Sequence, residues 1–228
     1  MENPPTQVSA HAEPSPVLGH PSSPRRVAVA MLLGGLGFSV ASILAYSIWA
    51  TGLIEHELAL YSSIALAYLL LSGLFIHRLV PGERKFLRFY AAFVPAFLCF
   101  AMIWTVCYFS LRGTLGETVG SALGLAVLTP IMLAVLQRRF CWFWECLGIL
   151  FLFHTLGYTL GGLCYYSSYG VGAEGVLNHP GGNPLLASFL DGKHVLAILL
   201  WGFFHGLGFG AGLGYLFTRP KRSSPDGA

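Results

Sequence analysis

The chain has 228 residues, of which 55% are apolar and only 10% are charged, and its mean hydropathy is +0.66. These values exclude an ordinary soluble domain, because too few polar residues are present to cover a surface exposed to water. The formal charge of +3 does not indicate a nucleic-acid-binding protein, because the arginines form short clusters at the ends of apolar stretches, where lipid headgroups lie. We therefore expect an all-α, polytopic membrane protein that contacts a lipid bilayer and no nucleic acid.

Residues 1–26 precede the first apolar stretch and contain six prolines without apolar periodicity. Such a segment cannot bury enough apolar surface to offset the entropy lost on ordering it. The sequence predicts a disordered, Pro-rich cytoplasmic tail here and a short basic cytoplasmic tail at residues 219–228.

Six apolar stretches between residues 27 and 218 are long enough to cross a hydrocarbon core of roughly 30 Å. We expect each to be helical, because the bilayer offers no water to free backbone groups and the stretches lack the alternation of barrel strands. The first stretch is not a signal peptide, because it far exceeds an apolar region of about 7 to 15 residues. The expected spans are residues 27–53, 58–79, 86–110, 117–137, 141–167 and 195–217.

The basic residues are divided unequally between the two sides of this expected membrane domain. Eleven of the thirteen Lys and Arg residues fall on one side, and Arg112 and Lys193 fall on the other. Five acidic residues join the latter two, so that side carries two minus five, or minus three, charges. The positive-inside rule then predicts that both termini are cytoplasmic, and we expect the cytoplasmic membrane of a bacterium.

Residues 168–194 form the one long loop, which this topology makes extracytoplasmic. Its glycines and prolines predict turns, and Leu185–Leu190 is expected to form a short, half-buried interfacial helix. The chain contains no serine-hydrolase, zinc-protease or phosphate-loop motif. The sequence therefore favours a role other than that of an enzyme.

Glycines recur every four residues in the last span, a spacing that lets two membrane helices approach closely. The expected partner of this ridge is the span at residues 141–167, which has Gly157 and Gly161; a second copy of the chain or another membrane protein is the alternative partner. The glycines of the ridge in the last span are Gly202, Gly206, Gly210 and Gly214, and those of a further ridge in the fourth span are Gly116, Gly120 and Gly124.

Two acidic residues and two cysteines have conventional structural interpretations. Glu117 opens the fourth expected span, where the helix dipole stabilises a carboxylate. Glu145 lies close enough to the membrane surface to reach it or to pair with the neighbouring arginines, and a role in a proton relay is the alternative. All five cysteines fall within spans as small apolar residues, while Cys107 and Cys164, near the outer ends of their helices, leave a disulfide open as an alternative.

The candidate functional site consists of four residues in the last two spans. His154 and His205 both lie in the central half of the bilayer, at a rise of about 1.5 Å per residue. Tyr158 is one turn beyond His154, and Trp201 is one turn from His205. A neutral imidazole at this depth can bind a metal ion or haem, donate to a quinone or carry a proton. The alternative is that each histidine bonds a carbonyl or hydroxyl group of a neighbouring helix and only holds the helices together.

Residues 205–210 read HGLGFG, which is similar to a short stretch in the nickel-permease family of hydrogenase and urease accessory proteins. The histidine and aspartate motif of that family has no counterpart between Val27 and Leu53. No property of the family is therefore carried over.

Three functional classes follow. A transport or permeation protein is indicated by the six spans with their intramembrane histidines. A subunit that assists the assembly of a membrane complex is indicated by the glycine ridges. A haem- or quinone-linked redox protein using His154 and His205 is the alternative.

Overall fold

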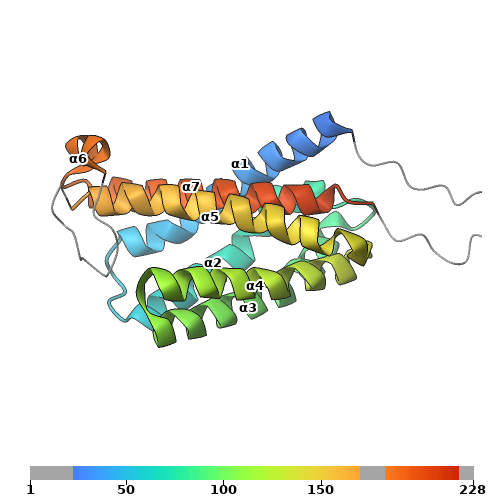
Figure 1. Ribbon diagram of the computed structural model, residues 1–228, viewed down its shortest axis with the longest axis horizontal. Helices are drawn as coiled ribbons and strands as arrows, with labels where there is room; N and C mark the ends of the chain where they lie inside the picture. Colours follow the sequence, from blue (N-terminus) through green and yellow to red (C-terminus); the bar gives the residue numbers. More distant parts are fainter. Residues whose placement is uncertain (1–22, 170–182, 221–228) are drawn as a thin grey trace, which may run out of the picture.

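A computed structural model of the chain describes residues 23–169 and 183–220 as an all-helical bundle (Figure 1). Six of its helices are long and apolar enough to cross a membrane, which confirms the expected all-helical fold and is compatible with a multi-pass membrane protein. Residues 1–22 of the expected disordered tail and most of the basic C-terminal tail lie outside the described residues, as do residues 170–182 of the long loop. Residues 24–26, expected in the disordered tail, instead form the start of the first long helix, because Ser23 caps it and Pro24 suits its first position. The long helices are α1 (Pro24–Ala50), α2 (Glu57–Ile76), α3 (Lys85–Leu111), α4 (Gly113–Val135), α5 (Phe143–Ser167) and α7 (His194–Phe217).

Short helical segments continue or connect the long ones. Single 3₁₀ turns extend α2 at His77–Leu79 and precede α5 at Phe140–Trp142. The expected interfacial helix is α6 (Pro184–Leu190), which begins at Asn183, whose side chain accepts hydrogen bonds from the first backbone N–H groups. Ala187 and Leu190 of α6 are buried while Leu185 and Phe189 are exposed, so α6 has one packed face and one open face.

Helix α4 begins four residues earlier than the sequence predicts. Arg112 is the single residue between α3 and α4, and both it and Gly113 have positive φ, at 56° and 57°. This tight link makes α3 and α4 an antiparallel hairpin. Glu117 therefore lies in the second turn of α4 with only 9% of its surface exposed, and the expected role at the helix start is wrong.

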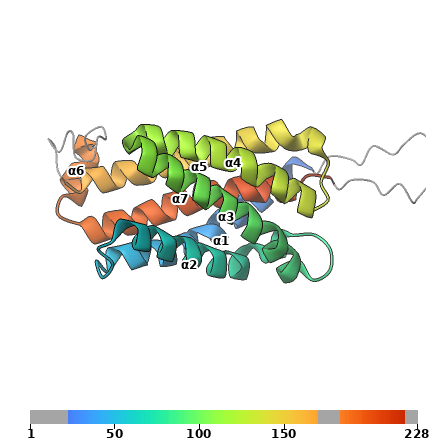
Figure 2. The same ribbon diagram turned by 90° about the horizontal axis from the view of Figure 1, so that it is seen from below.

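Helix α7 packs along α1 on one side and along α5 on the other (Figures 1 and 2). Helix α2 packs on the far side of α1, and α4 connects the α3–α4 hairpin to α5. Contact between α2 and α3 is slight. The six long helices thus form a ring in the order α2, α1, α7, α5, α4 and α3, with weaker contacts where the α3–α4 hairpin meets α2 and α5.

The glycine ridge of the last span packs on α1, so the expected partner, the span now seen as α5, is wrong. A Cβ atom on Gly206 would lie 2.6 Å from the Cα of Ser39, and one on Gly214 would lie 2.9 Å from the Cα of Met31. Gly202 and Gly210 likewise face the backbone of α1. Side chains at these four positions would force α1 and α7 apart.

A different face of α7 packs on α5. Gly208 faces Gly157 and the carbonyl of Phe153, while Gly161 faces the Cα of Trp201. Glycines four residues apart indicated only one close-packing face of α7. The helix has a second face of small residues, and it packs on α1 through the first face and on α5 through the second.

The glycines of α4 also pack within the chain, against α3. A Cβ atom on Gly116 or Gly120 would lie 3.0 Å from the Cα of Tyr108 or Trp104, respectively, and Gly124 faces Phe100. The three predicted ridges are therefore occupied by intramolecular contacts.

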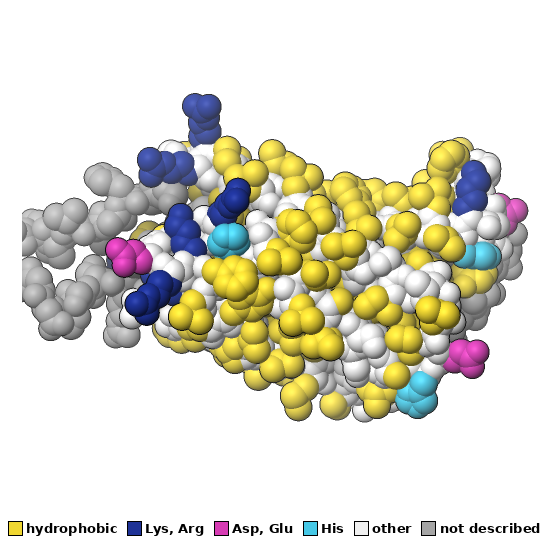
Figure 3. Space-filling model, turned by 180° about the vertical axis from the view of Figure 1, so that it is seen from behind, with side chains coloured by type: hydrophobic (Ala, Val, Ile, Leu, Met, Phe, Trp, Pro, Cys, Tyr) yellow, Lys and Arg dark blue, Asp and Glu magenta, His cyan; other side chains and the backbone are white. Residues whose placement is uncertain are grey.

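We call the end of the bundle where α1 begins and α7 ends the terminal end, and the other the far end. The Lys and Arg side chains gather at the terminal end (Figure 3), as the antiparallel order of the helices requires. Arg112 and Lys193 lie at the far end, together with Glu57 and Asp191.

Candidate functional site

A cavity of about 540 Å³ occupies the half of the bundle nearer the far end. It lies between the α3–α4 hairpin and helices α1, α2, α5 and α7, because α2 and α3 make little contact with each other. Its lining is predominantly aromatic, with a few polar groups distributed among the rings. This combination is typical of binding sites for small organic molecules.

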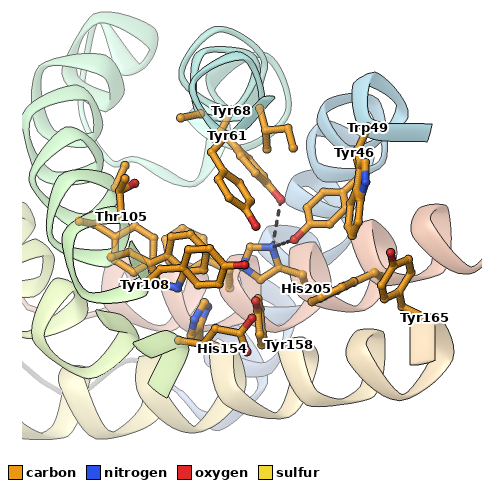
Figure 4. A pocket seen from close by; sticks show the side chains of 18 of the residues that line it. Tyr46, Trp49, Tyr61, Tyr68, Thr105, Tyr108, His154, Tyr158, Tyr165 and His205 are labelled. Atoms are coloured by element: carbon orange, nitrogen blue, oxygen red, sulfur yellow. Dashed lines mark hydrogen bonds between the residues drawn. The ribbon is translucent and has the colours of Figure 1, made fainter. Parts of the chain in front are cut away.

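All four residues of the predicted site line this cavity (Figure 4). The rings of His154 on α5 and His205 on α7 have centroids 5.1 Å apart, with an angle of 70° between their planes. Tyr158 lies 5.7 Å from His205 and 5.2 Å from Trp201, again between centroids. The structure thus brings together residues from two helices into one cluster.

Each histidine has one ring nitrogen bonded to a hydroxyl group of a neighbouring helix. His154 Nε2 lies 3.1 Å from Ser121 Oγ on α4. His205 Nδ1 lies 3.0 Å from the hydroxyl of Tyr68 on α2 and 3.5 Å from that of Tyr46 on α1. These contacts match the alternative considered from the sequence, in which the histidines connect helices.

The hydroxyl of Tyr68 also lies 2.5 Å from Ser42 Oγ, so Ser42, Tyr68 and His205 form a continuous series. Two phenols converge on Nδ1 of His205, and a phenol readily donates to an imidazole nitrogen. Nδ1 is then the acceptor, and the proton of the neutral ring lies on Nε2.

The remaining polar atoms of the cluster are not used by these contacts. His154 Nδ1, His205 Nε2 and Trp201 Nε1 are buried and have no hydrogen-bond partner among the described residues. A buried polar group without a partner costs about 1 to 3 kcal/mol. These three atoms are therefore unsatisfied polar groups of residues that line the cavity.

Glu117 also lines the cavity, although the sequence had placed it at the start of the fourth span. Its carboxyl group shares a hydrogen bond with the hydroxyl of Tyr158. A second hollow of about 150 Å³ between α4 and α5 is also lined by Glu117, His154 and Tyr158, together with four threonines, Thr114, Thr118, Thr155 and Thr159. Glu117, His154 and Tyr158 thus line both the aromatic cavity and this smaller hollow.

The cavity reaches the far end of the bundle and is closed toward the terminal end. At the far end Arg112 forms an ion pair with Glu57 at 3.3 Å, and both side chains are about half exposed. Toward the terminal end Phe38, Phe97 and Phe209 close the cavity, with the buried rings of Phe89 and Phe93 stacked below them. Access is therefore from one side of the bundle.

Other candidate groups do not join this site. Cys107 and Cys164 are free thiols, so the disulfide left open from the sequence is not formed. Among the described residues, no group of three or more His, Cys, Asp or Glu side chains could hold a metal ion. A metal at the histidine pair would have those two residues as its protein ligands.

The residues that the sequence analysis missed are the partners of the two histidines. Ser42, Tyr46, Tyr68 and Ser121 lie on helices other than those of the histidines. A signal was present, because Ser39, Ser42 and Tyr46 recur at helical spacing on an otherwise apolar span. It indicated a polar face on α1, but not which helix that face contacts.

The described residues form an all-helical bundle, compatible with a multi-pass membrane protein, with an aromatic cavity around two histidines. Comparisons with protein-family models, with curated proteins and with solved structures found no match. The residues of the cavity itself are therefore the basis for assigning a function.

Proposed function

We propose that the chain is a membrane transport or permeation protein whose cavity binds a small, flat, mainly apolar molecule that carries hydrogen-bond acceptors. The observation that carries this proposal is an aromatic cavity lined by His154, His205 and Trp201, each of which has one ring nitrogen without a partner among the described residues. Stacking on the rings would provide most of the affinity, and the three nitrogens would orient the ligand.

A transport role is supported by the one-sided access. The cavity extends from the far end to the middle of the bundle, where the phenylalanine layer closes it. Transporters that alternate their access hold the substrate near the membrane midplane. Opening of the terminal end would require the phenylalanines of α1, α3 and α7 to separate.

The proposal includes cytoplasmic termini in a bacterial membrane. It is supported by the concentration of basic residues at the terminal end. Reporter fusions after Ala228 and within residues 171–184 should report the cytoplasm and the exterior, respectively. The reverse pattern would contradict this orientation.

Binding can be tested with 1,4-naphthoquinone, a flat molecule with two carbonyl acceptors. It should quench the emission of the tryptophans that line the cavity in a saturable manner. His154→Phe and His205→Phe keep an aromatic ring but remove the nitrogens, and each should weaken binding at least about tenfold, the effect of roughly 1.4 kcal/mol. His77→Gln, which changes a histidine outside the cavity, is the control. Quenching that does not saturate, or equal binding by all variants, would contradict the proposal.

Transport can be tested separately with proteoliposomes and 1,4-naphthoquinone-2-sulfonate, whose charge slows passage through lipid. Uptake above that of protein-free vesicles, lost in His205→Phe, is the expected result. Saturable binding without uptake would leave a binding protein and remove the transport role.

A quinone-linked redox protein is the second candidate. It is favoured by the series Ser42, Tyr68 and His205, which would supply a proton to a bound quinone through hydroxyl and imidazole groups. A haem held between the two histidines is not favoured, because their rings are in direct contact. A visible spectrum of the purified protein distinguishes these cases, since a haem or flavin would absorb strongly.

A role in assembling a membrane complex has less support. It depended on the glycine ridges as surfaces for a partner or a second copy, and these glycines face α1, α3 and α5 of the same chain.

A further inference from the structure

Two arginines are buried at the terminal end, remote from the cavity. Arg138, in the turn between α4 and α5, is 5% exposed, and Arg219, just after α7, is 7% exposed. Arg138 Nη2 donates to the carbonyl oxygen of Phe217 at 2.8 Å. It therefore satisfies an end carbonyl of α7 that would otherwise repel an anion.

Arg219 lies between two aromatic rings. Its guanidinium carbon is 4.1 Å from the ring centroid of Tyr215 and 5.1 Å from that of Trp142. Arg219 Nη1 lies 3.5 Å from Glu145 Oε1, which also accepts a hydrogen bond from Tyr215. Glu145 thus pairs with Arg219. The sequence had instead offered the arginines beside Glu145 as its partners.

The two guanidinium groups retain buried donors. Arg138 Nε, Arg219 Nε and Trp142 Nε1 have no hydrogen-bond partner among the described residues. Burial, and then the nearby Arg88, lower the pKa of the Arg138 guanidinium below its usual range. An arginine nevertheless remains charged at neutral pH, so this region is short of negative charge.

A hollow of about 250 Å³ adjoins Arg138 and is also lined by Arg139, Phe140 and Cys141. Phe140 is 55% exposed and nearby Trp144 is 78% exposed. Exposed aromatic rings beside arginines at the end of a membrane helix are typical of the headgroup region of a bilayer.

We propose that Arg138, Arg219 and Trp142 form a binding site for a phosphate group, supplied by a phospholipid headgroup or by a free phosphate compound. Guanidinium groups bind phosphate through paired, charge-assisted hydrogen bonds, and Arg138 and Arg219 each retain a buried Nε donor. Basic pockets between membrane helices bind anionic headgroups in this way.

Native mass spectrometry of the delipidated full chain tests the site with three probes: phosphatidylglycerol, diacylglycerol with the same acyl chains, and inorganic phosphate. Phosphatidylglycerol should be retained and diacylglycerol lost. Arg138→Gln and Arg219→Gln should each weaken retention at least about tenfold, the effect of roughly 1.4 kcal/mol. Arg78→Gln removes the same charge from an exposed position at the same end of the bundle, outside the hollow, and should change retention less than about twofold, or roughly 0.4 kcal/mol.

Because Arg138→Gln also deprives Phe217 of a partner, Trp142→Phe provides a gentler variant that keeps a ring beside Arg219 and removes only the Nε1–H group. It should weaken phosphatidylglycerol binding about fivefold, as expected for one hydrogen bond. If inorganic phosphate binds with the same dependence on the arginines and displaces the lipid, the source is a free phosphate compound. Equal retention of phosphatidylglycerol and diacylglycerol, or equal effects of Arg138→Gln and Arg78→Gln, would overturn the proposal.

Discussion

Gly157 and Gly208 face each other directly: a Cβ atom on either would lie 3.1 Å from the Cα atom of the other. Gly157 lies three residues after His154, and Gly208 lies three residues after His205. The close approach of α5 and α7 at these glycines therefore brings the two histidine rings together one turn away. The candidate site depends on this helix contact as much as on the histidines themselves.

We expect Gly208→Ala to destabilise the protein by about 1 to 3 kcal/mol, because the added methyl group would collide with the carbonyl of Phe153. Gly148→Ala is a matched control on α5, since nothing lies within 4 Å of its Cβ position. That control should be neutral or stabilising by up to about 1 kcal/mol, because alanine favours a helix over glycine. Thermal unfolding in detergent, followed by circular dichroism, measures both. Equal effects of the two changes would show that α5 and α7 are not in close contact.

Gly206→Leu and Gly210→Leu should reduce stability far more than Leu207→Ala. Leucine at either glycine would separate α7 from Phe38 and its neighbours on α1, whereas alanine at position 207 only shortens a half-buried side chain. The midpoint of thermal unfolding in detergent should be much lower for Gly206→Leu and Gly210→Leu than for Leu207→Ala. Tolerance of all three changes would mean that this face of α7 contacts lipid.

Tyr68→Phe should lower the free energy of unfolding by about 1 to 3 kcal/mol, because it removes the hydroxyl that bonds both Ser42 and His205. Tyr90→Phe removes a hydroxyl that donates to the carbonyl of Leu70 in an exposed setting, and it should cost less than about 1 kcal/mol. Denaturant titration of the two variants checks the difference. A larger loss in Tyr90→Phe would be inconsistent with a buried series through Tyr68.

The ion pair between Glu57 and Arg112 should contribute at most about 1 kcal/mol, because both side chains are about half exposed. Glu57→Gln and Arg112→Gln should therefore shift thermal unfolding only slightly, and less at high salt than at low salt. A large loss that salt does not reduce would indicate that the pair is shielded by parts of the chain beyond the described residues.

The sequence by itself determined the spans, their helical form and the shared depth of the two histidines. A bilayer imposes all three, because it requires about 20 apolar residues per crossing and leaves backbone groups no partner outside the helix. It also requires polar side chains at mid-depth, such as His154 and His205, to face the protein interior and find polar partners there.

Only the tertiary structure decided which faces meet. The glycine ridge of α7 predicted a close helix contact. Because all the spans are strongly apolar, the sequence pattern did not distinguish α1 from α5 as the partner. The displacement of Glu117 into the cavity followed from a one-residue link at Arg112, whose positive φ is not encoded by residue type. The tyrosines and serines around the histidines converge from four helices, and their meeting depends on the rotation of each helix about its axis, which packing alone fixes.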